Sequence, residues 1–312
     1  MPLDVCVVGE INPDLILYGI PESLQPEKEA LIDRFRITLG ASSAIFAHNL
    51  AVLGTRVGMI SKIGADPLGK TALDSLASSG VDVTRVSVAS GGTSTGLTVI
   101  LTQPEHRFIL TYPGTMFELD YADLDLDFIF SARHLHLGSL FLLKSLRPHI
   151  AELFRAAKAK GLSTSLDTND DPEDKWGDDL LSVLPFVDIF FPNEREAKKI
   201  AGTDNLNEAI EKLSQKCKSL VVKLGSKGAI VRKGLDEWRC DATPVVVVDS
   251  VGAGDSFEAG YIHRFLQGKD PQACLEYAAV AGALSTTQEG GTEAFKDRSA
   301  VEKFLLEHLR KS

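Results

Sequence analysis

Cysteine, basic charge and long apolar runs are all in short supply in this 312-residue chain. The four cysteines are far apart in the sequence and show no CxxC or other metal-ligand spacing, which is typical of reduced thiols in a cytosolic protein and excludes a disulfide framework. Acidic residues outnumber basic ones by 43 to 33, and this net charge of −10 argues against nucleic acid and anionic membranes as partners. No run approaches the roughly 18 apolar residues that a membrane span needs. We therefore expect a cytoplasmic protein.

Apolar runs that alternate with helical patterns dominate the chain after residue 118. Strand–helix alternation predicts an α/β fold with a three-layer, doubly wound and mostly parallel sheet. Strands are expected at 3–8, 57–63, 134–137, 163–167, 188–191 and 220–224, with edge strands at 229–232, 238–240 and 245–248. The clearest helices are expected at 41–53, 68–77, 147–160, 205–216, 253–267, 271–286 and 298–309.

Two patches of alternating polar and apolar residues interrupt this rhythm, at 12–39 and 92–117. The first contains a strand pattern at 34–38, and the second predicts a hairpin over 95–112 with its turn at 103–106. We expect one nucleotide- and substrate-binding core formed by 1–11, 40–91 and 118–312, with the two patches forming a small discontinuous β-sheet that covers the substrate as a lid.

The strongest motif is Asp249-Ser-Val-Gly-Ala-Gly-Asp-Ser-Phe257, which lies between an apolar run and a long helical pattern. Glycines at 252 and 254 let the backbone curl around an anion, and the N-terminus of the following helix adds partial positive charge. Asp255 falls in the first turn of that helix, where its carboxylate could accept a proton from an attacking hydroxyl. The motif alone predicts only a phosphate site.

This motif resembles the C-terminal signature of the ribokinase (PfkB) family of carbohydrate kinases. Further segments resemble family motifs in the same order: Gly9 with Asp14, Gly40 to Gly54, Gly64 to Gly69, Asp167 to Asn169, Asn193 to Glu196, and Lys223 to Ala229. The resemblance implies an ATP-dependent kinase for a sugar hydroxyl or, alternatively, for a nucleoside. It also implies Mg²⁺, suggests K⁺, and is compatible with a homodimer formed through the free edges of the lid.

The resemblance assigns roles residue by residue. Asp255 is the expected base and Gly252, Ala253 and Gly254 form the anion hole; Asp14, Gly40, Ala41, Ile45 and Asn169 are expected at the substrate, Asn193, Lys223, Gly225 and Gly228 at the nucleotide, Glu196 at Mg²⁺ through water, and Asp249 at a monovalent cation. Two positions depart from the family pattern. Ile45 replaces an asparagine that contacts the sugar, and Asp170 with Asp171 follows Asn169 where an arginine is frequent. These changes favour a neutral sugar or nucleoside over a sugar phosphate.

Several of these residues have simpler interpretations. Asn193 and Glu196 form the pattern of a helix capping box, and Asp14 could be a turn residue. Asp167 and Asn169 could face the substrate or form a simple turn; the turn is favoured for Asp167, and both possibilities stay open for Asn169. The histidines of His134-x-His136 are more commonly packing residues than metal ligands. Residues 64–71 also satisfy the phosphate-loop pattern GxxxxGK[ST], although Asp66 would place negative charge inside it. A third alternative is a non-catalytic sugar- or nucleotide-binding regulator, against which the intact Asp255 and Glu196 argue.

Overall fold

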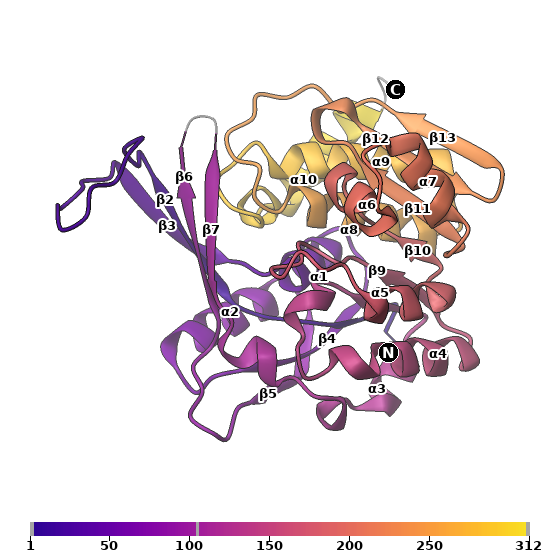
Figure 1. Ribbon diagram of the computed structural model, residues 1–312, viewed down its shortest axis with the longest axis horizontal. Coiled ribbons are helices and arrows are strands. Elements are labelled where there is room, and N and C mark those ends of the chain that lie inside the picture. The colour runs from indigo at the N-terminus through magenta and orange to yellow at the C-terminus, as the bar shows by residue number, and fades with distance from the viewer. Residues whose placement is uncertain (1–2, 104–105, 310–312) are drawn as a thin grey trace.

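The computed structural model describes residues 3–103 and 106–309 of the chain. Within these residues the larger sheet has nine strands in the order β13-β12-β11-β10-β9-β8-β1-β4-β5, and only the β11–β12 and β12–β13 pairs are antiparallel (Figure 1). The strands are β1 (Val5–Val8), β4 (Val57–Ile63), β5 (Asp82–Val88), β8 (His134–Leu137), β9 (Ser163–Leu166), β10 (Ile189–Phe190), β11 (Ser219–Lys223), β12 (Ala229–Lys233) and β13 (Asp236–Cys240).

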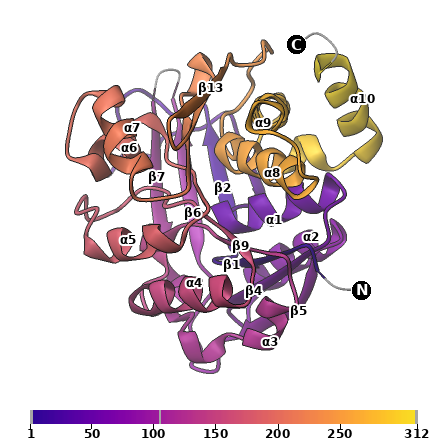
Figure 2. The same ribbon diagram turned by 90° about the vertical axis from the view of Figure 1, so that its right-hand side faces the viewer.

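Helices cover both faces of this sheet, which gives the predicted three layers (Figure 2). One face packs α1 (Ser42–Val52), α2 (Pro67–Ser78), α8 (Ala253–Leu266) and α9 (Pro271–Ser285). The other packs α3 (Leu126–Phe130), α4 (Ile150–Ala159), α5 (Asp178–Val183), α6 (Glu194–Ala201) and α7 (Leu206–Ser214), while α10 (Arg298–Leu309) packs against α9. The neighbouring strands β1, β8 and β9 are buried on both faces of the sheet, as expected for a parallel sheet between helices.

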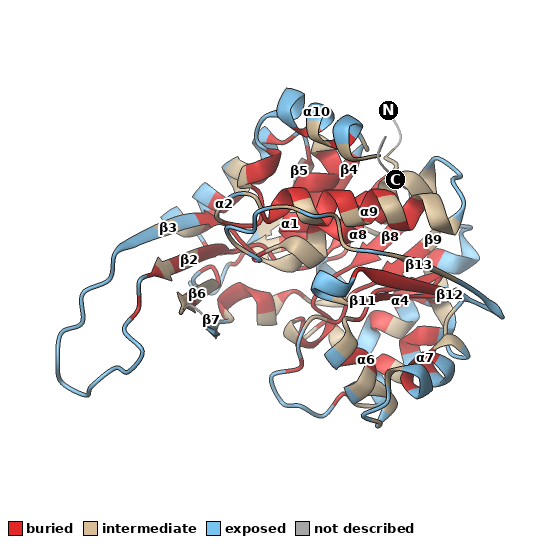
Figure 3. Ribbon diagram, turned by 90° about the horizontal axis from the view of Figure 1, so that it is seen from above, coloured by how far each residue is buried: buried red, intermediate tan, exposed pale blue. Residues whose placement is uncertain are grey.

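A separate four-stranded sheet stands beside this core, in the order β3-β2-β6-β7. Its strands are β2 (Pro13–Tyr18), β3 (Arg34–Leu39), β6 (Leu97–Thr102) and β7 (Arg107–Tyr112). The two central strands, β2 and β6, run parallel, and the outer pairs are antiparallel. The connection between β2 and β3 is long and largely exposed (Figure 3). The predicted hairpin turn includes residues 104 and 105, which lie outside the described residues.

One predicted strand is wrong. Residues 245–248 form no strand, and Val246, Val247 and Val248 are 85, 62 and 52% exposed. The sheet ends at β13, and this apolar run finds no strand to pair with. It leads instead along the wall of a cavity described below. β5 is an additional edge strand that the sequence pattern did not reveal.

Over 3–103 and 106–309, no helix has both the length and the apolar character required to cross a bilayer.

Candidate active site

The turn before α8 is held in an open, anion-receptive shape by its glycines. Gly252 caps the helix with φ 72°, and a Cβ there would lie 2.5 Å from Cα of Gly291, so both backbone conformation and space require glycine. The first helical hydrogen bond runs from the N–H of Ser256 to the carbonyl of Gly252 (2.9 Å). The preceding N–H groups therefore lie at the open, partially positive end of α8.

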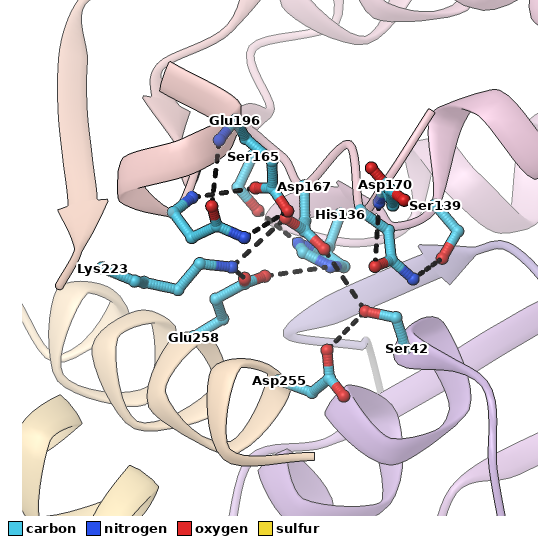
Figure 4. Close-up of polar contacts among 12 residues, drawn as sticks. Ser42, His136, Ser139, Ser165, Asp167, Asp170, Glu196, Lys223, Asp255 and Glu258 are labelled. Atoms are coloured by element: carbon cyan, nitrogen blue, oxygen red, sulfur yellow. Dashed lines mark hydrogen bonds and ion pairs between the residues drawn. The ribbon is translucent and has the colours of Figure 1, made fainter. Parts of the chain in front are cut away.

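Asp255 lies in the first turn of α8 and accepts a hydrogen bond from the hydroxyl of Ser42, in the first turn of α1 (Figure 4). Burial raises the pKa of Asp255 to about 7, and the nearby charge of Asp167 acts in the same direction. The hydrogen bond from Ser42 opposes both effects, because it stabilises the ionised form. A carboxylate tuned to this range can accept a proton near neutral pH.

Asp167 links this pair to a lysine. Its Oδ2 lies 3.3 Å from the Ser42 hydroxyl and its Oδ1 lies 3.3 Å from Nζ of Lys223, at the end of β11. Lys223 also forms an ion pair with Glu258, one turn after Asp255 on α8. Because Asp167 is buried in this network, the prediction that favoured a simple turn role for it is wrong.

A cavity of about 540 Å³ opens beside this network. Lys223, Gly225 and Gly228 line it from the β11–β12 connection, and Ala253, Gly254 and Phe257 line it from α8. The connection turns sharply, since Gly225 and Gly228 have φ values of 59° and 86°, and a Cβ at Gly228 would collide with the carbonyl oxygen of Cys240. The fold thus brings three predicted nucleotide residues together with the anion turn.

Asn193 and Glu196 form the predicted capping box at the start of α6, each side chain accepting from the backbone N–H of the other. Asn193 adjoins Lys223 through a β-bridge. Burial raises the pKa of Glu196 to about 7 despite the opposing charge of Lys223. Carboxylate and amide oxygens are the ligand types that Mg²⁺ prefers. The residues present fit that ion.

Asp14 lies on β2 in the smaller sheet and is 5% exposed. Burial raises its pKa to about 7, aided by the charges of Asp255 and Asp249. Gly40 allows the approach of this carboxylate, because a Cβ there would lie 1.9 Å from Oδ1 of Asp14. Ala41 follows as the N-cap of α1 with φ 65° and ψ 130°, a backbone conformation that favours glycine.

Asn169 has φ 53°, and its amide donates to the hydroxyl of Ser139 (3.3 Å). Asp170 forms an exposed ion pair with Arg195 (2.6 Å), so its charge is partly compensated. Asp171 is buried and accepts backbone hydrogen bonds from the turn that follows it, including the N–H of Trp176. The carboxylates of Asp170 and Asp171 are thus both engaged, one in an ion pair with Arg195 and the other in backbone hydrogen bonds.

Ile45 is 3% exposed and packs under the anion turn, where its Cγ2 would lie 3.1 Å from a Cβ at Gly252. Asp249, before the turn, already accepts hydrogen bonds from the N–H groups of Val251 and Gly290 (both 3.0 Å) and from the Tyr18 hydroxyl (3.2 Å). These donors occupy much of its carboxylate, and K⁺ at this position stays a prediction.

The segment that matches the phosphate-loop pattern has its own backbone donors engaged. The N–H of Gly69 donates to Asp66 (2.9 Å), and the N–H of Gly64 donates to the hydroxyl of Thr95 (2.8 Å). Asp66 caps α2, and Lys70 forms an exposed ion pair with Asp74. This arrangement holds a helix N-terminus and leaves no cradle for phosphate.

A family model described as pfkB family carbohydrate kinase matches residues 2–298. The chain belongs to this family. It is 31% identical over 311 residues to an ATP-dependent ribose-1-phosphate kinase from Halopiger xanaduensis, covering 98% of this chain and 99% of the relative. It is 29% identical over 308 residues to a nucleoside kinase from Methanothermobacter thermautotrophicus, covering 97% and 96%. The ATP and Mg²⁺ complex of an E. coli protein assigned as a ribokinase II superimposes with a TM-score of 0.86 at 25% identity, over 98% of this chain and 100% of that one.

Membership in the PfkB family makes this chain a kinase that phosphorylates an alcohol group.

Sequence reasoning missed Ser42 and Glu258, which contact Asp255 and Lys223, respectively, in the structure. Each is a single common residue with no distinctive spacing. The only available signal was their place one helical turn or less from a recognised motif.

Proposed function

We propose that this protein transfers the γ-phosphoryl group of ATP to a hydroxyl of a neutral sugar, with Asp255 as the base. The observation that carries the proposal is the place of Asp255, which faces Ser42 at the open end of α8 beside a cavity of about 540 Å³. A base at this position would meet the anion turn and a nucleotide in the cavity at one point.

Asp255 takes the proton as the acceptor oxygen attacks the γ-phosphorus, and the bond from that phosphorus to the β,γ-bridging oxygen breaks to release ADP. The N–H groups of Ala253 and Gly254 stabilise the negative charge that develops on the transferred group. Ser42 holds the carboxylate of Asp255 in place through its hydroxyl, which also contacts Asp167. The lid residues limit access of water to this reaction.

Glu196, with Asn193 beside it, is the residue that would hold Mg²⁺ through water, and the ion would neutralise phosphate charge when bound. Lys223, Gly225 and Gly228 line the place for the nucleotide. Asp249 is the proposed neighbour of a monovalent cation. We expect these functions in the cytoplasm, where ATP and reduced cysteines coexist.

Asp14, Gly40 and Ala41 would face the acceptor, opposite Asn169. A buried carboxylate accepts hydrogen bonds from sugar hydroxyls, and the carboxylates of Glu10, Asp14 and Asp255 make this corner unfavourable for an anion. Lys70 is engaged with Asp74, and Arg107 donates to the hydroxyl of Ser250 (3.1 Å), so neither cation is directed at Asp14. A nucleoside is the second candidate, because a nucleoside kinase is among the full-length relatives.

ADP release measured across hexoses, pentoses, ketodeoxygluconate, nucleosides and ribose 1-phosphate tests the proposal. Asp255→Asn should lower the transfer rate by about 10² to 10⁴-fold while Mg·ATP still binds. Lys70→Ala is the matched control, since under the phosphate-loop hypothesis it would abolish turnover, and we expect it to stay near wild type. Near-normal transfer by Asp255→Asn overturns the assignment of the base. No turnover of any acceptor by the wild type supports the binding-protein alternative.

We also infer that two copies pair through the smaller sheet. On the face of that sheet turned away from the core, cross-strand pairing places eight apolar side chains in two rows: Ile37, Leu15, Val99 and Leu110, then Phe35, Leu17, Leu101 and Phe108. Phe35, Ile37, Phe108 and Leu110 are 52–64% exposed. An apolar surface of this kind is complementary to a second copy of itself.

A further inference from the structure

Lys223 is the basic group at the meeting point of the nucleotide cavity and the Ser42–Asp255 pair. Its side chain lines the cavity, and its Nζ lies 3.5 Å from the place where a Cβ of Gly254 would stand, directly against the anion turn. It also contacts Asp167 and Glu258 (Figure 4). The carboxylates of Asp167 and Glu258 thus hold the ammonium group of Lys223 against the anion turn.

Glu258 forms an ion pair with this ammonium group on the side away from the cavity. The side chain of Glu258 is 1% exposed, whereas that of Lys223 is 15% exposed, so the pair has one closed end and one end open to the cavity. Among the described residues, Oε2 of Glu258 has no hydrogen-bond partner, and its neighbour is Nε2 of His136 at 4.0 Å. Burial lowers the pKa of His136 well below its usual range, and its ring stacks on Phe46. Lys223 is thus the cation that compensates Glu258.

We propose that Lys223 holds the phosphoryl group during its transfer and that Glu258 is a positioning residue that directs Lys223 toward the anion turn. This inference rests on the proposed kinase function and adds a role for a residue outside the glycine turn. The amine transfers no proton. It stays charged while the γ-phosphorus exchanges its bond to the β,γ-bridging oxygen for one to the acceptor oxygen, whose proton passes to Asp255.

A purely structural ion pair is the alternative. Buried ion pairs add little net stability, because desolvation offsets most of their attraction, and neutral replacements are frequently tolerated. A structural pair also has no reason to leave its cationic end at the wall of a ligand cavity. A preorganised cation beside backbone donors, in contrast, stabilises charge that develops on a phosphoryl group. The two explanations differ in whether removing the charge of Lys223 weakens binding of the γ-phosphate.

Binding measurements separate them without any acceptor. The affinities of the protein for Mg·ADP and for Mg·AMP-PNP, measured by calorimetry, give its preference for the γ-phosphate. Lys223→Met should reduce that preference by about tenfold or more and change Mg·ADP affinity less. Because the single variant leaves Glu258 buried without its partner, Lys223→Met/Glu258→Gln provides a variant with both charges removed, and it should show the same loss. An unchanged preference in the double variant overturns the proposal.

Lys218→Met is the matched control, since Lys218 lies just before the opposite end of β11 and is 67% exposed. It should bind both nucleotides as the wild type does. If Lys218→Met lowered the preference as much as Lys223→Met, the effect would be one of overall charge, and the specific role of Lys223 would be wrong.

Kinetics test the positioning role of Glu258. Glu258→Gln keeps the shape but removes the charge, and it should lower kcat by about 10- to 100-fold with a smaller change in the KM for ATP. Glu258→Asp should recover part of kcat. A loss of melting temperature with kcat unchanged in the folded protein would show a structural role and contradict the proposal.

The two levels of the proposal fail in distinguishable ways. If no acceptor is phosphorylated but Lys223→Met abolishes the γ-phosphate preference, the proposed sugar-kinase function is wrong and Lys223 remains the γ-phosphate ligand. If sugars are phosphorylated and both charge-removed variants keep wild-type kcat and preference, the function stands and the inference about Lys223 and Glu258 is wrong.

Discussion

The hydroxyl of Ser42 donates a hydrogen bond to the carboxylate of Asp255, although 213 positions separate the two residues in the chain. Helix α1 supplies the serine immediately after the Gly40-Ala41 turn, and α8 supplies the aspartate immediately after the anion turn. Two helix N-termini therefore converge on one carboxylate. Their partial positive charge and the serine hydroxyl both favour the ionised form of Asp255 against the effect of its burial.

Ser42→Ala should move the acidic limb of the pH–rate profile to higher pH. For the wild type, kcat/KM is expected to rise through about pH 7 and then level off, because the base must be ionised and burial raises the pKa of Asp255 to about 7. Losing the serine donor removes a stabiliser of the carboxylate, so the pKa rises further. Steady-state rates from pH 5 to 9 measure the shift, and Ser42→Thr, which keeps a hydroxyl, is the control. A shift of the alanine variant to lower pH would contradict this account.

Asp255→Asn should stabilise the ligand-free protein, and the stabilisation should be larger at pH 8 than at pH 5. The native pKa of Asp255 is about 7 and the ordinary value is 3.8, so the native state binds more protons than the unfolded state between these values. Its contribution to stability is therefore full below about pH 4 and is lost as the pH rises to about 7. Asparagine cannot ionise and escapes this loss. Melting temperatures at both pH values test the prediction, with exposed Asp204→Asn as the control, and a greater stabilisation at pH 5 would contradict it.

Ala41→Gly should raise the free energy of unfolding by about 1 kcal/mol, because alanine is strained at φ 65° and ψ 130° and glycine is not. Chemical denaturation measures the change. Ala156→Gly, within α4, is the matched control and should destabilise by about 0.5–1 kcal/mol, since glycine costs conformational entropy in a regular helix. Equal losses in both variants would show that the conformation of Ala41 carries no strain.

Phe108→Glu should convert the proposed homodimer into a monomer, because it places a charge within the exposed apolar face of the smaller sheet. Analytical ultracentrifugation of wild type and variant measures this. Leu306→Glu, at a 56% exposed leucine on α10, is the control and should leave the mass unchanged. A wild type that is already monomeric, or a variant that stays dimeric, would contradict pairing through this face.

The layered core could be predicted from the sequence because each buried strand is a short apolar run and each helix has a recognisable end. Residues 134–137 and 57–63 were expected as strands and are β8 and β4. The run 245–248 had the same composition and failed, because strand formation also needs a partner, and the sheet already ends at β13. Local composition does not contain that information.

The site was predictable only where a motif constrains the backbone. Gly252, Gly228 and Gly40 are recognisable because a Cβ at each would collide with a neighbouring atom or carboxylate. Ser42 and Glu258 could not be found this way, since their roles come from contacts between elements distant in sequence. Asp167 was misjudged for the same reason: its partners, Ser42 and Lys223, are 125 and 56 positions away.

The parallel pairing of β2 with β6 at the centre of the smaller sheet has a practical consequence for engineering. The two strands come from segments separated by α1, β4, α2 and β5, so neither hairpin is a complete module. Transplanting one segment from a relative would place foreign side chains against a native central strand and mismatch half of the surface that we propose faces the acceptor. If that proposal holds, exchange of acceptor preference between relatives requires both segments to be moved together as a matched pair.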